Sequence, residues 1–480
     1  MYPIAGGNHN TYLLRGLAAA GYGHLREDWL VRTPDPTPIF SALVAAAWSA
    51  TGRFGLIAMG VSAAAVYLWA LYRLACPQSS SRPRSAQAWS CVLLLGLLHA
   101  RLVRGVFAAA GIPWIRALTS GVAEQALLAH ALQPALFGVL LVAALVHLRD
   151  GRHRTGMLHA VGAATVHPTY LWASASLAGA GLLLEARRRG IRRALVTATI
   201  GLITVTPIVV YVVANFVDTD PATAETAARI LARERIPHHA LPSRWFGAVA
   251  VVQVGLVVLA TAIVRDRATK TLFGVPMVLA VVVSSIVAVT GSNRLALVFP
   301  WRSSTVLVPA ATACLIGTIV RVTFERAPSL ARHMLRVLWL AFLASVVYGA
   351  TAMGRPAHWA DDDAEAVYAH ARASATAGQL WWIPEHFERF RLATGLPAWV
   401  DRKSHPYDPE SVLEWRRRIE ATRRLARGTA DCAEIRDIVR RSGITHVVTS
   451  VRSRSTRRCL VGRSTFTGPR YVVRRVGPPR

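Results

Sequence analysis

The chain has 480 residues, of which 53% are hydrophobic and 17% charged, a balance that argues against one water-soluble core and favours a membrane protein. The formal charge is +29, but Lys270 and Lys403 are the only lysines, and the arginines do not alternate with aromatic residues. This pattern argues against nucleic-acid binding and leaves anionic lipid or phosphate as the expected partner.

Apolar segments of helical length follow one another over most of the chain. Each is close to the roughly 20 residues that cross about 30 Å of hydrocarbon as a helix. We predict a mainly α fold, a polytopic transmembrane bundle of about nine to eleven helices, some of them short or re-entrant. The segments are Ile39–Ala50, Phe54–Ala75, Ala88–Val103, Pro134–Leu148, Met157–Leu184, Ala194–Ala214, Phe246–Val264, Thr271–Thr290, Ser303–Val320 and Leu335–Met353.

The start of the chain is polar, with the stretch Gly6-Gly7-Asn8-His9-Asn10. We therefore predict no cleavable signal peptide. Either the first outer loop, residues 1–38, begins the protein, or another helix precedes it.

Arginine clusters at 149–154 and 187–193 indicate two cytoplasmic loops. The segment between them must enter the membrane and return. His167-Pro168 lies near its middle, where proline removes a backbone donor and disfavours helix at the preceding residue. We expect two half-helices that meet there.

If the crossings alternate from these two cytoplasmic loops onward, residues 354–480 lie outside the cytoplasm. We predict that they form a small soluble α/β domain, and that the protein lies in the plasma (inner) membrane. Residues 1–353 would form the membrane domain, with outer loops at 1–38 and 215–245. In the soluble domain we expect helices at 409–425 and 433–441 and a strand at 445–451. Cys432 and Cys459 are its only cysteines, which predicts a disulfide, the alternative being two unpaired thiols.

Carboxylates outside the soluble domain are concentrated in the two outer loops. Glu27 and Asp28 lie in the first, and Asp218 and Asp220 in the second. Such residues could bind Mg²⁺ or Mn²⁺, and one of them could deprotonate an attacking hydroxyl. The alternative is surface acids solvated beside arginines.

Two further segments carry polar residues at predicted outer helix ends. His167-Pro168-Thr169-Tyr170 places an imidazole at a helix break, where it either serves the function or caps a helix. Arg302 follows Pro300-Trp301 at a helix start, where a guanidinium could hold a lipid phosphate or could anchor the helix at the interface.

This layout resembles the GT-C superfamily of membrane glycosyltransferases, which use polyprenyl-phosphate-linked sugars. The similarity lies in a long first outer loop with the acidic run Glu27-Asp28-Trp29, a proline-led helix from Pro36 to Phe40, and a C-terminal extracytoplasmic domain. The resemblance implies that an acidic residue of the first loop, Asp28 or Glu27, serves as catalytic base or metal ligand. The chain departs from the superfamily in having no apparent helix before this loop.

The chain also resembles an uncharacterised bacterial family of polytopic membrane proteins. The matching motifs include Asn8-His9-Asn10-Thr11-Tyr12, the His167–Tyr170 run and Lys403-Ser404-His405-Pro406-Tyr407. These motifs add Asn8, His9, Tyr170, Lys403 and His405 to the candidate substrate-binding residues. The 403–407 run either contacts an acceptor sugar or forms a structural turn.

Together these features predict a glycosyltransferase that moves a sugar from a polyprenyl-phosphate-linked donor to a cell-envelope glycan or another acceptor. Arg302 would hold the donor, and Asp28 or Glu27 would activate the acceptor. One alternative is a transporter or flippase for a lipid-linked or anionic solute. The other is a non-catalytic envelope assembly protein.

Overall fold

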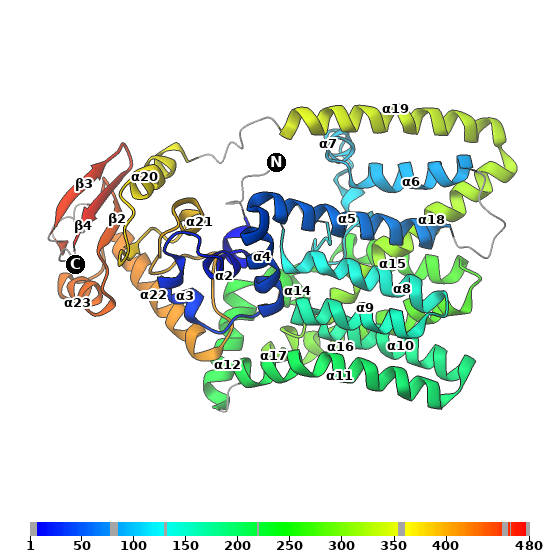
Figure 1. Cartoon of the computed structure of the whole chain (residues 1–480), viewed down its shortest axis with the longest axis horizontal. Helices are drawn as coiled ribbons and strands as arrows, with labels where there is room; N and C mark the ends of the chain where they lie inside the picture. The colour runs from blue at the N-terminus through cyan, green and yellow to red at the C-terminus, as the bar shows by residue number, and fades with distance from the viewer. Residues whose placement is uncertain are drawn as a thin grey trace.

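Most of the chain forms a bundle of long helices, which run across the right-hand part of Figure 1. The computed structural model describes residues 7–76, 85–128, 132–217, 220–353, 361–453, 459–460 and 462–476. The predicted fold class, a mainly α membrane bundle with a small C-terminal α/β part, is confirmed. The helices of the bundle are α5 (Arg53–Ala75), α6 (Ser85–His99), α7 (Arg101–Ala109), α8 (Val139–Arg149), α9 (His153–Val166), α10 (Leu171–Arg189), α11 (Ile191–Phe216), α15 (Ala248–Ile263), α16 (Arg267–Thr290), α18 (Ser304–Arg326) and α19 (Pro328–Met353).

Five helices in the described ranges are long and apolar enough to cross a membrane, and a sixth is added if α6 and α7, bent by 66°, count as one span. The chain is therefore an integral membrane protein. The predicted bundle of nine to eleven helices included short ones, and several apolar segments do fold as helices shorter than a full crossing. Pro38–Thr51, Pro134–Arg149 and Ala248–Ile263 are of this kind.

The centre of the bundle is α8, in which every residue from Leu141 to Leu148 is buried. A helix that is covered on all sides is typical of a central position, and α8 contacts α5, α9, α10, α16 and α18. By contrast, α11 and α19 expose many valine, leucine and isoleucine side chains, as expected of helices that face lipid.

The break predicted at His167-Pro168 is present. Helix α9 ends at Val166, Pro168–Tyr170 form a short 3-10 turn (η4), and α10 begins at Leu171. The backbone of His167 is extended, with φ −137° and ψ 96°, as proline requires of the preceding residue. Because α9 and α10 pack against each other, His167 lies at the turn of a helical hairpin.

A four-stranded mixed sheet lies at the left end of the molecule in Figure 1. Successive side chains of its strands point to opposite faces. Trp382 and Val447 join one apolar cluster with α22 and α23, and Trp381 and Val448 join another with α20 and α21, so both faces are covered. The strand order is β1-β2-β4-β3, and only β1 and β2 are parallel. The elements are α20 (Asp362–Ala373), β1 (Trp381–Trp382), α21 (Phe390–Thr394), α22 (Pro409–Arg427), α23 (Cys432–Ser442), β2 (His446–Ser450), β3 (Arg463–Thr467) and β4 (Tyr471–Arg475).

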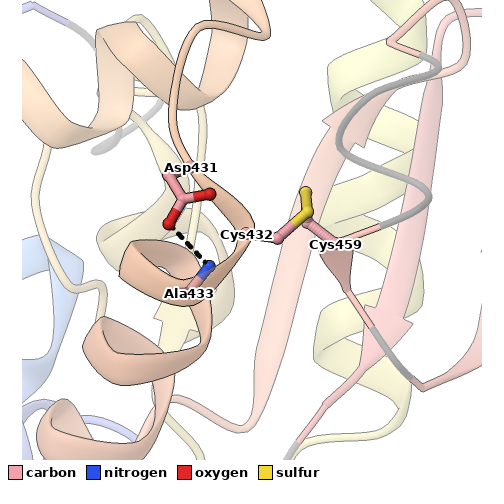
Figure 2. Close-up of a disulfide and its surroundings, with 4 residues drawn as sticks. All are labelled: Asp431, Cys432, Ala433 and Cys459. Carbon is pink, nitrogen blue, oxygen red and sulfur yellow. Dashed lines mark hydrogen bonds between the residues drawn. A yellow bond between two sulfur atoms is a disulfide. The ribbon is translucent and has the colours of Figure 1, made fainter.

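Cys432 and Cys459 are joined by a disulfide, shown in Figure 2. Their Cα atoms are 4.7 Å apart, and the residues are separated by 27 positions in the sequence. Cys432 is the first residue of α23, where Asp431 caps the helix by accepting a hydrogen bond from the backbone N–H of Ala433 at 3.1 Å. The bridge therefore ties the capped start of α23 to the segment that precedes β3.

The N-terminal segment packs against the C-terminal part, as the dark blue and yellow-orange ribbons of Figure 1 show. The N–H of His24 donates to the carbonyl of Gly395 at 2.7 Å. Gly23 has a φ of +55°, and a Cβ atom there would lie 2.4 Å from the Gly395 oxygen, so this contact requires glycine. The segment contains α1 (His9–Tyr12), α2 (Leu14–Ala19), η1 (Leu25–Glu27), α3 (Trp29–Arg32) and α4 (Pro38–Thr51).

Short elements lie between the long helices, and two of them, α12 and η5, contact α22 of the C-terminal part. Helix α12 packs against α22 and α17, and the turn η6 packs against α16, α18 and α10. The predicted domain boundary at residue 353 adjoins residues outside the described ranges and stays a prediction. The connecting elements are η2 (Pro113–Leu118), η3 (Pro134–Gly138), α12 (Pro221–Arg229), the π-helical turn η5 (Ile230–Arg235), α13 (Pro237–Ala240), α14 (Pro242–Trp245), α17 (Asn293–Ala296) and η6 (Pro300–Ser303).

Candidate functional site

Arg302 and His167 form a buried pair where η6 meets η4. NH1 of Arg302 donates to Nε2 of His167 at 3.0 Å and also to the hydroxyl of Thr169. Arg302 is 7% exposed and His167 3%. The guanidinium carbon lies 4.8 Å from the ring centre of Phe299 and 5.8 Å from that of Tyr170. The aromatic faces therefore help to hold the buried cation in place.

Two buried N–H groups of this pair are available to a ligand. A guanidinium can only donate, so His167 accepts at Nε2 and carries its ring proton on Nδ1. Nδ1 of His167 and Nε of Arg302 are both buried, and neither has a hydrogen-bond partner among the described residues. Buried donors are nearly always paired in proteins. Two such donors beside a positive charge are suited to a phosphate oxygen.

The backbone before Arg302 is unusual. Phe299 has φ +53° and ψ 56°, in the left-handed region, although a residue before proline normally adopts an extended conformation. Strained residues of this kind are concentrated at functional sites. In this conformation Phe299 places its own ring beside the guanidinium and starts the turn that brings Arg302 to the beginning of α18.

Arg235 and His405 form a second pair of the same construction. Nε of Arg235 donates to Nδ1 of His405 at 3.2 Å, and NH2 donates to the carbonyl of Lys403 at 2.7 Å. Nδ1 also lies 3.3 Å from that carbonyl, but the guanidinium can only donate, so we assign Nδ1 as the acceptor and Nε2 as the protonated nitrogen. Nε2 is buried, and no described residue accepts from it.

Tyr12 and Tyr407 lie between the two pairs. The ring of Tyr12 is 6.3 Å from that of His167, and the ring of Tyr407 is 4.7 Å from that of His405. The segments that carry the two tyrosines are in contact, because the hydroxyl of Ser404 donates to the carbonyl of Asn10 at 3.1 Å. Burial, followed by the contact with Tyr12, raises the pKa of Tyr407, and the charges of both arginines oppose that rise. The two arginine–histidine pairs therefore border one region.

This region is positively charged. None of the ion pairs found in the described ranges includes Arg235, Arg302 or Lys403. Burial lowers the pKa of His405 well below its usual range, and it lowers the pKa of His239, with neighbouring positive charges adding to the effect, to about 3. Both imidazoles are therefore neutral at pH 7. The cations of the site include the two guanidinium groups and the ammonium group of Lys403.

Asn8 and His9 adjoin the site through the short helix α1. The side-chain amide of Asn8 donates to Gln133 at 2.6 Å, and Nε2 of His9 accepts from the backbone N–H of Leu132 at 2.8 Å. Thr11 then contacts the Lys403 carbonyl at 3.4 Å. The structure thus brings together most of the predicted substrate-binding residues, namely His167, Tyr170, Arg302, Lys403 and His405, with Asn8 and His9 at the edge.

Sequence reasoning missed Arg235, His239, Tyr12 and Tyr407. Arg235 belongs to an outer loop whose arginines and acids balance, and nothing in that loop distinguishes it from Arg233. The two tyrosines do lie within motifs on which the family resemblance rests. A search for aromatic residues within those motifs is the signal that could have found them.

Asp28 lies elsewhere, fully buried between the N-terminal segment and the C-terminal part. One oxygen accepts from Nε of Arg391 at 2.6 Å and from the N–H of Ala398 at 2.9 Å, and the other accepts from the N–H of Leu30 at 2.8 Å. Arg391 also binds Asp401. The role of Asp28 as catalytic base stays a prediction, and in this arrangement three donors compete with a substrate hydroxyl for its oxygens.

Glu27 is more accessible than Asp28. Its side chain is 38% exposed, and one oxygen accepts from the backbone N–H of Gly378 at 2.9 Å. The other lies 3.9 Å from the ring of His24. Glu27 therefore keeps an oxygen accessible to solvent, and its catalytic role also stays a prediction.

The predicted metal ligands are not arranged as a metal site in the described part of the chain. Asp220 caps α12 by accepting from the backbone N–H groups of Ala222 and Thr223, and Asp28 is occupied as above. Asp218 lies outside the described residues. Within those residues no three His, Cys, Asp or Glu side chains are grouped to hold a metal ion. We therefore derive no step that passes through Mg²⁺ or Mn²⁺.

Comparison with known proteins gives a family model and several solved structures, among them two of one protein. A domain of unknown function, DUF6798, matches residues 362–422, which include α20, α21 and the 403–407 run. No curated protein matches the chain. The crystal structure of ArnT from Cupriavidus metallidurans in the apo state is 13% identical, with 98% of this chain and 94% of that chain covered and a TM-score of 0.46. The same protein bound to undecaprenyl phosphate is 13% identical, with 100% and 95% covered and a TM-score of 0.47.

Proposed function

We propose that this chain is a membrane glycosyltransferase that transfers a sugar from a polyprenyl-phosphate-linked donor to a cell-envelope acceptor. The observation that carries the proposal is the buried Arg302–His167 pair, with its two unpartnered donors, at the start of the apolar helix α18. A polyprenyl chain is buried in hydrocarbon while its charged phosphate remains at the level of the helix ends. A guanidinium at a helix end is suited to that phosphate.

In the proposed reaction, the bond between C1 of the sugar and the phosphate oxygen breaks, and the hydroxyl oxygen of the acceptor bonds to C1. Negative charge grows on the departing phosphate, where Arg302 and the Nδ1–H of His167 stabilise it. A carboxylate takes the proton of the acceptor hydroxyl. Asp28 and Glu27 are the candidates for that role.

The proposed site faces the outside of the plasma (inner) membrane, together with the C-terminal part. At the opposite end of the bundle, Arg73 and Arg149 both bind Asp150, at 2.7 and 3.0 Å. The arginine clusters of the 149–154 and 187–193 loops lie at the same level of the helices, and such clusters are typical of the cytoplasmic side.

Purified protein is expected to bind undecaprenyl phosphate and to discriminate against undecaprenol, which has the same chain without the phosphate. Each hydrogen bond from a buried donor to the charged phosphate is worth about 1.5–3 kcal/mol, so two of them predict a discrimination of roughly 100-fold or more. Binding of radiolabelled lipid in detergent micelles measures it, with phosphatidylglycerol as a competitor that carries a different anionic head group. Equal affinity for the lipid with and without phosphate would refute the proposal.

A comparison of Asp28→Asn with Asp401→Asn tests whether Asp28 acts in the reaction or only stabilises the fold. The two carboxylates are matched, because both bind Arg391 and both are buried. If Asp28 is the base, Asp28→Asn should lower turnover of a polyprenyl-phosphate sugar by about 100-fold or more, while Asp401→Asn lowers it only in proportion to its loss of folded protein. Thermal unfolding of both variants gives that proportion. Equal turnover per folded molecule in the two variants would show that Asp28 is not the catalytic base. Glu27 would then be the remaining candidate.

A further inference from the structure

The Arg235–His405 pair repeats the chemistry of the Arg302–His167 pair on the other side of two tyrosines. In each pair a guanidinium donates to one ring nitrogen of the histidine, so the other ring nitrogen carries the proton. In each pair that protonated nitrogen is buried and lacks a partner in the described residues. His405 is 3% exposed, so water does not replace the missing partner easily.

We propose that the Arg235–His405 pair, together with Lys403, is a second anion subsite that binds a second phosphate-like group beside the lipid phosphate. This inference rests on the proposed function for the identity of the first anion. The second group comes either from the same lipid, as the outer phosphate of a diphosphate, or from a separate anionic substrate. The chemistry recognised is the same in both cases.

The charge of this subsite is not balanced by an ion pair in the described ranges, in contrast to the charge of other arginines of the chain. Arg391 is buried between two carboxylates, and Arg416 is paired with Glu234, the residue next to Arg235. No ion pair in the described ranges involves Arg235 or Lys403. A half-buried cation without a carboxylate is costly in the free protein, and an anionic ligand offsets that cost.

The two subsites are close enough to act on one molecule or on two that react. The 403–407 run contacts the helix of Tyr12, since Ser404 donates to the carbonyl of Asn10 at 3.1 Å and Thr11 donates to that of Lys403 at 3.4 Å. The charges of Arg235 and Arg302 both affect the pKa of Tyr407 and that of His239. Tyr12 also contacts His167, and Tyr407 contacts His405. Two positively charged subsites on either side of one tyrosine pair fit two neighbouring negative charges better than one.

The experiment compares three probes on the full-length protein in detergent: undecaprenyl phosphate, undecaprenyl diphosphate, and inorganic phosphate added after saturation with undecaprenyl phosphate. The variants are Arg235→Ala and His405→Phe, which keeps a ring against Tyr407 and Trp415 but removes the Nε2–H. Arg233→Ala is the matched control, since Arg233 belongs to the same turn but binds Asn293 and the Gly291 carbonyl. Melting temperatures identify any variant that fails to fold.

If both anions belong to one lipid, the wild-type protein binds the diphosphate more tightly than the monophosphate. Arg235→Ala and His405→Phe then lower the affinity for the diphosphate by about tenfold or more. Their affinity for the monophosphate stays unchanged. If the second anion is separate, inorganic phosphate binds to the lipid-loaded wild type and to Arg233→Ala but not to the two variants. The inference is overturned if neither pattern is seen. It is also overturned if Arg235→Ala weakens monophosphate binding as much as Arg302→Ala does, because one shared site then explains both pairs.

The two proposals can fail separately. Unchanged monophosphate binding in Arg302→Ala would refute the proposed function. The binding of inorganic phosphate would then still show whether the second subsite exists.

Discussion

Arg302→Ala is expected to weaken the binding of undecaprenyl phosphate by about 100-fold or more. The substitution removes the positive charge and the unpartnered Nε–H donor, and it also releases His167, whose ring position depends on the hydrogen bond from NH1 at 3.0 Å. Loss of the guanidinium also frees Nε2 of His167 to carry the proton, so the Nδ1–H donor is no longer assured. Binding of radiolabelled lipid to the purified variant measures the loss.

Arg302→Lys is the informative companion of this variant. Lysine keeps the charge but cannot donate to His167, Thr169 and a phosphate from one planar group. We expect it to recover only part of the affinity, with roughly tenfold weaker binding than wild type. Full recovery by lysine would show that charge alone matters and that the geometry of the pair does not.

Arg391→Ala is expected to destabilise the C-terminal part by about 3–5 kcal/mol, because it leaves two buried carboxylates without compensation. Arg391 and Asp28 are 2% and 0% exposed, and Arg391 also binds Asp401 and the carbonyl of Ala398. For a unit of this size the loss corresponds to a fall in melting temperature of roughly 10 °C or more. Tryptophan fluorescence reports it, because Trp381, Trp382 and Trp399 are buried in this part.

Arg423→Ala provides the control for Arg391→Ala. Arg423 lies on α22 and pairs with Glu385, but it is 36% exposed, so its removal should cost only about 0–1 kcal/mol. Combining Arg391→Ala with Asp28→Asn and Asp401→Asn should destabilise less than Arg391→Ala alone, since no buried charge then remains. If the two single arginine variants melt alike, the buried cluster does not hold the N-terminal segment in place.

Local patterns determined much of the fold. Hydropathy identified the membrane helices, because burial in lipid requires continuous apolar runs. Proline chemistry located the break at His167, and the charged periodic stretches after Pro409 and Cys432 became α22 and α23. The number of helices that cross the whole membrane was harder to predict from the sequence. A short apolar segment such as α8 has the composition of a membrane crossing, although it is buried among other helices.

For the candidate site, too, the sequence predicted some features and not others. Sequence position alone suggested Arg302 and His167 individually, because each follows or precedes a proline at an expected helix end. Their partnership spans 135 positions, and that of Arg235 with His405 spans 170. No local periodicity encodes such pairings, since they depend on how whole elements pack. The left-handed backbone of Phe299 is a further case, because tertiary contacts there override the preference of a residue before proline.

By itself, the sequence determined that this protein is a membrane helical bundle with a small α/β part and with polar residues at its helix ends. It could do so because hydrophobic length, proline and charge act within a few residues of one another. Only the tertiary structure decided that Asp28 is buried against Arg391 and that two arginine–histidine pairs border one positively charged region. The burial of a charged group and the partner that compensates it depend on segments far apart in the chain.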